Sequence, residues 1–173
     1  INPLLVKLSV PMMVSMLVQA LYNVVDSVFV SHVSESALTA VSLAFSLQNV
    51  MIAVGVGTGV GVNALLSKSL GEKNQARANK TAENGIFLAF CSFAVFFLIG
   101  LTCMRAYFYA QTSDAEIAEQ GIRYLRVCSL FSLGLFLQTM SEKLLAATGR
   151  THLSMISQLI GAVVNIILDP IFI

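Results

Sequence analysis

The 173-residue sequence contains no tryptophan, only three prolines and three cysteines, and only 11% of its residues are charged. A soluble globular domain usually has about 25% charged residues. An odd number of cysteines, in or beside apolar runs, does not form a disulfide framework, and we interpret them as small buried hydrophobic residues. The net charge of +1 and the absence of a basic aromatic patch give no indication of a nucleic-acid partner.

Hydrophobic residues make up 57% of the chain, and the mean hydropathy is +0.83. No run alternates like the strands of a membrane barrel. A spanning helix needs about 20 mostly apolar residues, and we predict five spans, at about 4–33, 37–66, 85–109, 121–148 and 153–173. The fold class is therefore all-α, a polytopic transmembrane bundle. Polar breaks separate the spans, the longest at 67–84, and Gly149 is a predicted C-terminal helix stop.

Lysine and arginine indicate the orientation, because cytoplasmic loops carry an excess of both. Alternating spans place seven of these residues on one side and three on the other. The seven are Lys7, Lys68, Lys73, Arg77, Lys80, Lys143 and Arg150, and the three are Arg105, Arg123 and Arg126. We therefore expect a cytoplasmic N-terminus in the plasma membrane of a bacterium, its inner membrane, with no enzyme activity.

Two carboxylates lie inside predicted spans, Asp26 in the first and Asp169 in the last. A charge at the bilayer centre costs about 2.5–3.5 kcal/mol on insertion scales, so each acid must be shielded, protonated or balanced by a cation. At about 100° per residue, other polar side chains share the face of each acid. The stripe of the first span contains Ser15, Gln19, Tyr22 and Asp26, and Asn23 borders it. The stripe of the last span contains Ser154, Gln158, Asn165 and Asp169.

Prolines add to both polar faces. Pro170 has no N–H to donate, so the carbonyl of Ile166 loses its helical partner beside Asn165 and Asp169. Such oxygen clusters in interrupted helices often mark coupling-ion sites. We predict Asp26, Asn165 and Asp169 as the cation-coupling residues for Na⁺ or H⁺, with Pro11 and Pro170 as helix-bend candidates. No other metal and no organic cofactor is expected.

Other polar and small residues have plainer interpretations. Glu142 and Lys143 lie about two turns from the inner end of the fourth span, and we interpret them as a snorkelling or paired interfacial set. Gln48 and Asn63 are interpreted as bridges between helices. Within residues 55–61, "GVGTGVG", two pairs of glycines spaced four apart predict close helix approach.

Three stretches carry a resemblance: "QALYNVVDSVFVSHVSESALTAVSLA" from Gln19, "LLSKSLGEKNQARANKTAENG" from Leu65 and "LLAATGRTHLSMISQLIGAVVNIILDPIFI" from Leu144. With the Asn-x-x-x-Asp-Pro motif, the chain resembles the multidrug and toxic compound extrusion (MATE) family. The similarity is closest to the prokaryotic branch that includes the DNA-damage-inducible-protein-like transporters. It covers nearly the whole chain.

The resemblance implies an antiporter of twelve helices in two six-helix lobes, which exports small organic, often cationic, compounds in exchange for Na⁺ or H⁺. Residues 1–173 would form an incomplete N-terminal lobe, whose partners are membrane lipids, the sixth helix and the C-terminal lobe of the same polypeptide. It also implies that Asp26, Asn165 and Asp169 hold the cation. Gln19, Tyr22 and Asn23 are candidates for the substrate pathway because they lie along the stripe of Asp26.

Two other functions remain open from the residues. A lipid-linked sugar flippase of the same broad superfamily would need a basic cavity for pyrophosphate, whereas these spans offer acids. An intramembrane aspartyl protease also needs two membrane aspartates, but its Tyr-Asp and Gly-x-Gly-Asp motifs are missing, since Tyr22 and Asp26 lie four positions apart.

Overall fold

The computed structural model describes residues 6, 9–11, 13–14, 16–18, 20–21, 24–25 and 35–172, with the backbone alone at 35, 37, 165 and 168–172. The described residues between 6 and 25 are all helical. Six further helices follow: α2 (Glu35–Gly71), α3 (Gln75–Thr102), α4 (Met104–Gln111), α5 (Ala115–Leu130), α6 (Ser132–Ala147) and α7 (Thr151–Phe172). No strand occurs in this part of the chain, so the all-α prediction is confirmed.

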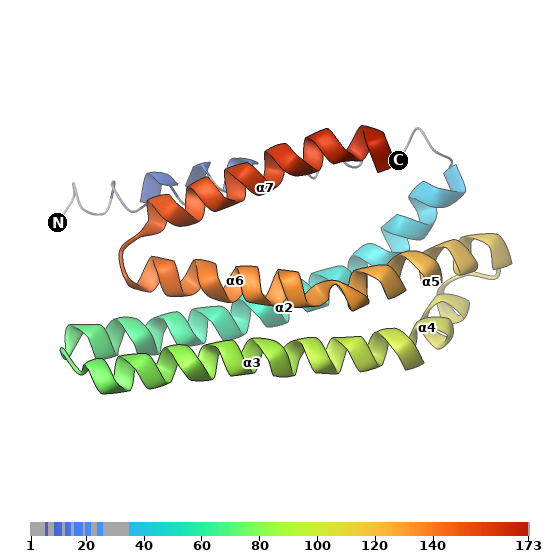
Figure 1. Cartoon of the computed structure of the whole chain (residues 1–173). Helices are drawn as coiled ribbons and strands as arrows, with labels where there is room; N and C mark the ends of the chain where they lie inside the picture. The colour runs from blue at the N-terminus through green and yellow to red at the C-terminus, as the bar shows by residue number, and fades with distance from the viewer. Residues whose placement is uncertain are drawn as a thin grey trace.

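Helices α2, α3, α5 and α6 form the packed body of the molecule, and α7 lies along α6 (Figure 1). The α2–α3 turn and the α6–α7 turn lie at the same end of the bundle, and the α4–α5 turn lies at the opposite end. The predicted orientation assumed that successive turns between spans lie on opposite sides of the membrane, and this arrangement agrees with that assumption. Which end faces the cytoplasm stays a prediction.

Several helices extend beyond the predicted spans. Within the described residues, Leu38–Gly71 and Gln75–Thr102 are long and apolar enough to cross a bilayer, and Thr151–Val164 is a shorter apolar helix. The polar stretch at 67–84, predicted as a loop, is helical except at its centre, because its many lysine, glutamate, alanine and arginine residues are good helix formers. Similarly, α5 starts at Ala115, where the Asp114 carboxylate accepts the backbone N–H of Glu116 at 2.9 Å.

Two of the predicted spans are interrupted. α3 gives way to α4 at Cys103, and α5 gives way to α6 at Phe131 (φ −94°, ψ 4°). Next to each break a hydroxyl donates back to a helix carbonyl, Thr102 to Leu98 at 2.8 Å and Ser132 to Ser129 at 2.8 Å. Such bonds compete with the backbone ladder and often bend helices.

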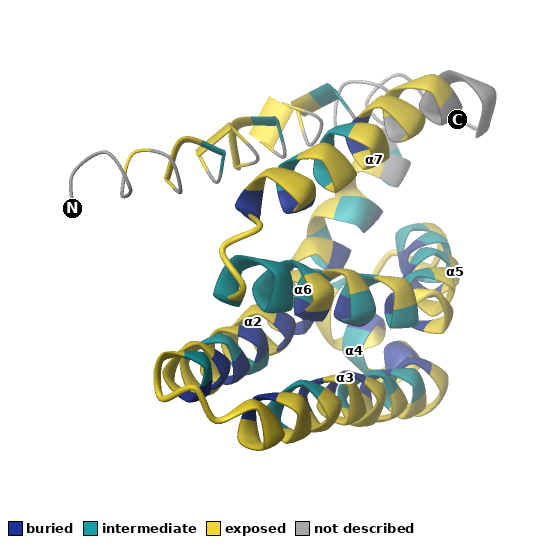
Figure 2. Cartoon of the chain, turned by 60° about the vertical axis from the view of Figure 1, so that its left-hand side comes forward, coloured by how far each residue is buried: buried dark blue, intermediate teal, exposed yellow. Residues whose placement is uncertain are grey.

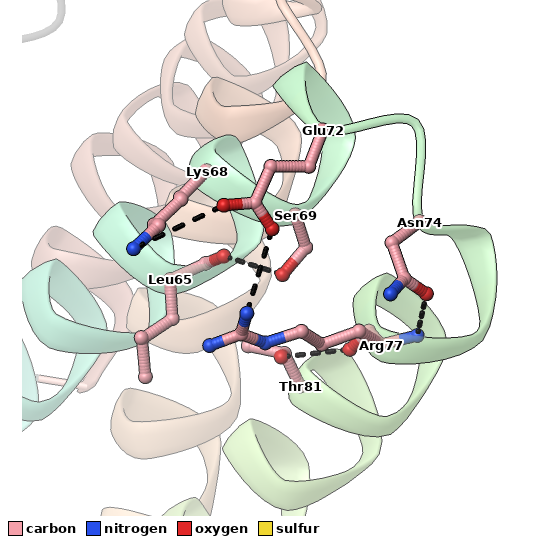
Figure 3. Close-up of polar contacts among 7 residues, drawn as sticks. All are labelled: Leu65, Lys68, Ser69, Glu72, Asn74, Arg77 and Thr81. Carbon is pink, nitrogen blue, oxygen red and sulfur yellow. Dashed lines mark hydrogen bonds and ion pairs between the residues drawn. The ribbon is translucent and has the colours of Figure 1, made fainter.

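A tight turn joins α2 to α3 (Figure 3). The N–H of Asn74 donates to the carbonyl of Ser69 and that of Lys73 to Leu70, both at 3.0 Å, which is the Schellman pattern. The side chain of Asn74 then accepts the N–H of Arg77 and so caps α3. This pattern requires a left-handed residue, and Lys73 occupies that position with φ 55°.

We expect Lys73→Gly to raise the free energy of unfolding by about 1 kcal/mol, because an L-residue in the left-handed region pays a steric cost that glycine avoids. Denaturant unfolding of the purified protein in detergent measures the change. Lys73→Ala is the matched control, since it removes the same charge but keeps the Cβ. An equal gain in both variants would show that charge, and not backbone conformation, is responsible.

Gly149 ends α6 as the sequence predicts. Its φ is 75°, and the N–H of Arg150 donates to the carbonyl of Leu145 at 3.0 Å. The same Schellman turn therefore closes α6 and α2, once with the preferred glycine and once with a lysine.

The core divides into two clusters along the bundle. One contains Ala44, Met104, Phe108, Ala118, Ile122 and Leu125, mainly from α4 and α5. The other contains Met51, Val62, Ala89, Phe96, Phe136 and Met140, from α2, α3 and α6, and the rings of Phe96 and Phe136 stack at 5.6 Å.

Exposed residues run along the outside of the helices (Figure 2), and many of them are large and apolar. Phe87, Val95 and Leu98 of α3 are all more than half exposed. Such a surface suits a chain whose outer face contacts lipid. The three cysteines form no disulfide, and Cys91 and Cys103 are exposed and not buried as predicted.

Candidate functional site

The predicted cation site lies mostly beyond what the structure describes. Asp26, Gln19, Tyr22 and Asn23 fall outside the described residues. Positions 165, 169 and 170 lie on α7, which is described there by its backbone. Among the described residues, no three His, Cys, Asp or Glu side chains meet as a metal site would require. These site residues therefore remain predictions.

The proline positions lie within helices. Pro11 is half-buried and helical, and α7 is assigned as helix through Pro170 to Phe172. The proposed bends at both positions remain predictions. In α7, position 169 follows position 158 by eleven residues, which brings it back to within about 20° of the same face and about 16 Å further along the axis.

The described part of that face contacts α6 through a polar bond. The side-chain amide of Gln158 donates to Oε2 of Glu142 at 2.8 Å. Its neighbour Ser154 is buried. The described face of α7 around Ser154 and Gln158 therefore packs toward α6, and helical periodicity places position 169 on the same face of the helix.

Glu142 also carries an ion pair. Its Oε1 lies 3.1 Å from Nζ of Lys143, with 30% and 21% of the two side chains exposed. The sequence predicted a snorkelling or paired set, and the structure shows the paired arrangement. The bond to Gln158, which connects this pair to the polar face of α7, was not predicted. The sequence pattern that could have indicated this bond is a carboxylate, Glu142, in an apolar run, followed by Gln158 in the next helix.

The lysine is held against α2. The side-chain amide of Asn63 donates to the backbone carbonyl of Lys143 at 2.7 Å. A Cβ added to Gly59 would lie 2.8 Å from Cγ of Lys143, so the missing side chain there makes room for the lysine stem. Gly55 faces Phe136 in the same seam, whereas no described atom lies within 4 Å of the Cβ positions of Gly57 and Gly61. Among the described residues, the Gly55/Gly59 pair serves close helix approach and the Gly57/Gly61 pair has no such contact.

Gln48 bridges helices as predicted. Its amide donates to the hydroxyl of Tyr124 at 3.1 Å and approaches Sγ of Cys128 at 3.6 Å. This contact joins α2 to α5. We therefore assign it to the framework of the bundle.

The contacts of α6 with α2 and α7 bring charged and polar groups together. They combine a carboxylate, two carboxamides and an ammonium group in a half-buried place. Charged hydrogen bonds are stronger in such surroundings than in water. The same face of α7 continues to the positions of Asn165 and Asp169.

Comparison with known proteins gives consistent matches. The MatE family model matches residues 11–171. Multidrug export protein MepA of Staphylococcus haemolyticus is 26% identical over 166 residues, which cover 95% of this chain and 37% of that protein. Probable multidrug resistance protein NorM of Thermotoga maritima is 26% identical over 167 residues, which cover 95% of this chain and 36% of that protein.

The solved structures agree with the sequence matches. A MOP superfamily transporter from Pyrococcus furiosus superposes with a TM-score of 0.93 at 29% identity, covering 98% of this chain and 37% of that one. The chain therefore spans little more than a third of the length of each of these proteins.

Proposed function

Because the chain belongs to the multidrug and toxic compound extrusion (MATE) family of integral membrane transporters, we propose that it forms part of a cation-coupled antiporter. In this proposal the whole polypeptide exports cationic drugs or other organic compounds in exchange for Na⁺ or H⁺. The family consists of transporters and not enzymes, which removes the aspartyl-protease alternative.

The observation that supports the proposal is the polar contact of α7 with α6, the bond from Gln158 to Glu142 at 2.8 Å. Helical periodicity places position 169 on the same face of α7 as Gln158. We assign the coupling cation to Asp26, Asn165 and Asp169, since carboxylate and amide oxygens suit Na⁺ and a carboxylate suits a proton. Gln19, Tyr22 and Asn23 would line the adjoining substrate path.

Coupling follows from competition for negative charge. A cationic substrate and the coupling cation both prefer ionised carboxylates, so entry of one favours release of the other. Each step needs a difference in affinity between two conformations. A change of bend at Pro11 or Pro170 is a local way to alter the site, because proline already lacks one helical hydrogen bond.

The remainder of the transporter belongs to this proposal as well. A sixth helix and a C-terminal lobe of the same polypeptide would complete the N-terminal lobe and the pathway. We place the protein in the plasma membrane of a bacterium, with the N-terminus and the α2–α3 turn in the cytoplasm. The turn carries Lys68, Lys73 and Arg77, in agreement with the positive-inside rule.

The test uses the full-length polypeptide reconstituted in liposomes loaded with a fluorescent cationic dye. A Na⁺ gradient and a pH gradient are imposed in turn. We expect dye movement under one gradient and its loss when an ionophore collapses that gradient. The effective gradient identifies the coupling ion.

The same assay separates the rival function. Absence of dye movement under both gradients, with folded protein in the membrane, would contradict a cation-coupled antiporter. Movement of a lipid-linked sugar in that preparation would then support the flippase alternative.

A further inference from the structure

The pair formed by Glu142 and Lys143 has an unusual geometry. Side chains at adjacent positions of a helix do not normally face each other, yet Nζ of Lys143 lies 3.1 Å from Oε1 of Glu142. The lysine stem reaches this place over Gly59, which has no Cβ, and its backbone is fixed by the amide of Asn63. Helix α2 therefore leaves room for the lysine stem at Gly59 and holds the lysine backbone through Asn63, so that the ammonium group reaches the carboxylate.

One acceptor beside the ion pair receives no hydrogen bond from the described residues. Glu142 receives one hydrogen bond from Lys143 and one from the amide of Gln158. The side-chain oxygen of Gln158, Oε1, is buried and accepts no hydrogen bond from the described residues. A buried acceptor without a donor is costly, and native proteins rarely keep one without a reason.

The carboxylate is also accessible enough for exchange. About a third of the Glu142 side chain is exposed, and about a fifth of the Lys143 side chain is exposed. A ligand that carries a positive charge and N–H donors can replace the lysine on Glu142 and also satisfy Oε1 of Gln158. A neutral ligand can supply donors, but it cannot replace the charge of the lysine.

We propose that Glu142 and Oε1 of Gln158 form a recognition point for a cationic substrate that carries N–H donors, such as the amino groups of an aromatic cation, and that Lys143 occupies Glu142 when no substrate is bound. This inference deepens the proposed transport function and rests on it. It assigns Glu142 and Gln158 to substrate binding, in addition to the predicted coupling residues. Lys143 competes with the substrate for the carboxylate of Glu142. A cationic substrate therefore binds only if its interaction with Glu142 is stronger than that of the lysine.

The two halves of the ion pair should have opposite effects on binding. In equilibrium dialysis of the full-length protein in detergent, with ethidium as the aromatic cation, we expect Glu142→Gln to weaken binding roughly tenfold. Lys143→Gln should strengthen binding several-fold, because the competitor is gone. Glu72→Gln, in an exposed ion pair with Lys68 and Arg77, should leave binding unchanged.

A purely structural ion pair gives another pattern. Both Glu142→Gln and Lys143→Gln would then lower thermal stability, and their ethidium affinities would change in the same direction or not at all. Either result overturns the proposal, as does the absence of ethidium binding to the unmodified protein. If Glu142→Gln does not fold, Gln158→Met replaces it, with an expected several-fold loss of affinity; unchanged affinity would refute the site.

The outcome is independent of ion coupling. Opposite shifts in ethidium affinity would support the recognition point even if no gradient drives transport. In that case only the proposed antiport would be contradicted. Gradient-driven transport with equal affinities in all variants would instead refute the recognition point alone.

Discussion

Asp26→Asn in the full-length protein is expected to reduce gradient-driven dye movement to the level of protein-free liposomes. Asparagine keeps the shape and one acceptor oxygen of aspartate, but it removes the charge and the protonation site. If Asp26 binds the coupling cation, neither Na⁺ nor H⁺ can then be exchanged for substrate. The measurement is the initial rate of dye movement under the effective gradient.

Asp114→Asn provides the matched control for this variant. Asp114 caps α5 at an exposed position, where its carboxylate accepts the N–H of Glu116, and asparagine caps a helix about equally well. Transport should therefore persist. Unchanged transport by Asp26→Asn, with normal amounts of folded protein, would remove Asp26 from the coupling site.

The largest expected effect on stability comes from Gly100→Ala. Gly100 is buried in α3, and a Cβ built there would clash with Cβ of Ser129 in α5. That carbon is attached directly to the backbone and cannot rotate away, so the two helices must separate. We expect a loss of about 2 kcal/mol in the free energy of unfolding, measured by denaturant titration in detergent.

Two further variants distinguish this contact from a general effect of alanine. Gly57→Ala, in a place without described atoms within 4 Å, should gain up to about 1 kcal/mol from helix propensity. Ser129→Gly in the Gly100→Ala background removes the opposing Cβ and should restore part of the lost stability. Failure of this second change to restore any stability would mean that the helices do not touch at Gly100.

The sequence predicts best what depends on composition and local rules. Apolar runs identify the helical membrane bundle, and Gly149 identifies the end of α6 because its left-handed backbone favours glycine. The end of α2 could not be predicted in this way. There the left-handed residue is Lys73, while the nearby Gly71 remains within the helix.

Features that depend on contacts between helices could not be predicted from local patterns. Ser132 and Gly134 near Phe131 are compatible with an intact helix, and only packing shows that α5 ends there. Glu142 and Lys143 similarly indicate a charge pair near a membrane edge, but their connection to Gln158 requires the position of α7 relative to α6. The roles of Asp26, Asn165 and Asp169 come from the stripe pattern and the family resemblance, and they await the transport assay.

The breaks at Cys103 and Phe131 have a mechanical consequence, because the close contact between Gly100 and Ser129 lies beside both of them. Beyond these breaks, α4 and α5 pack around Met104, Phe108 and Ile122, and Ala44 of α2 belongs to the same cluster. The hydroxyl of Tyr107 donates to the carbonyl of Leu43, and the amide of Gln48 donates to the hydroxyl of Tyr124, so α2 is bonded to both helices of the α4–α5 hairpin. Helix α2 is unbroken from Glu35 to Gly71 and contributes to both core clusters, so it splints the two breaks and keeps the two ends of the bundle in line.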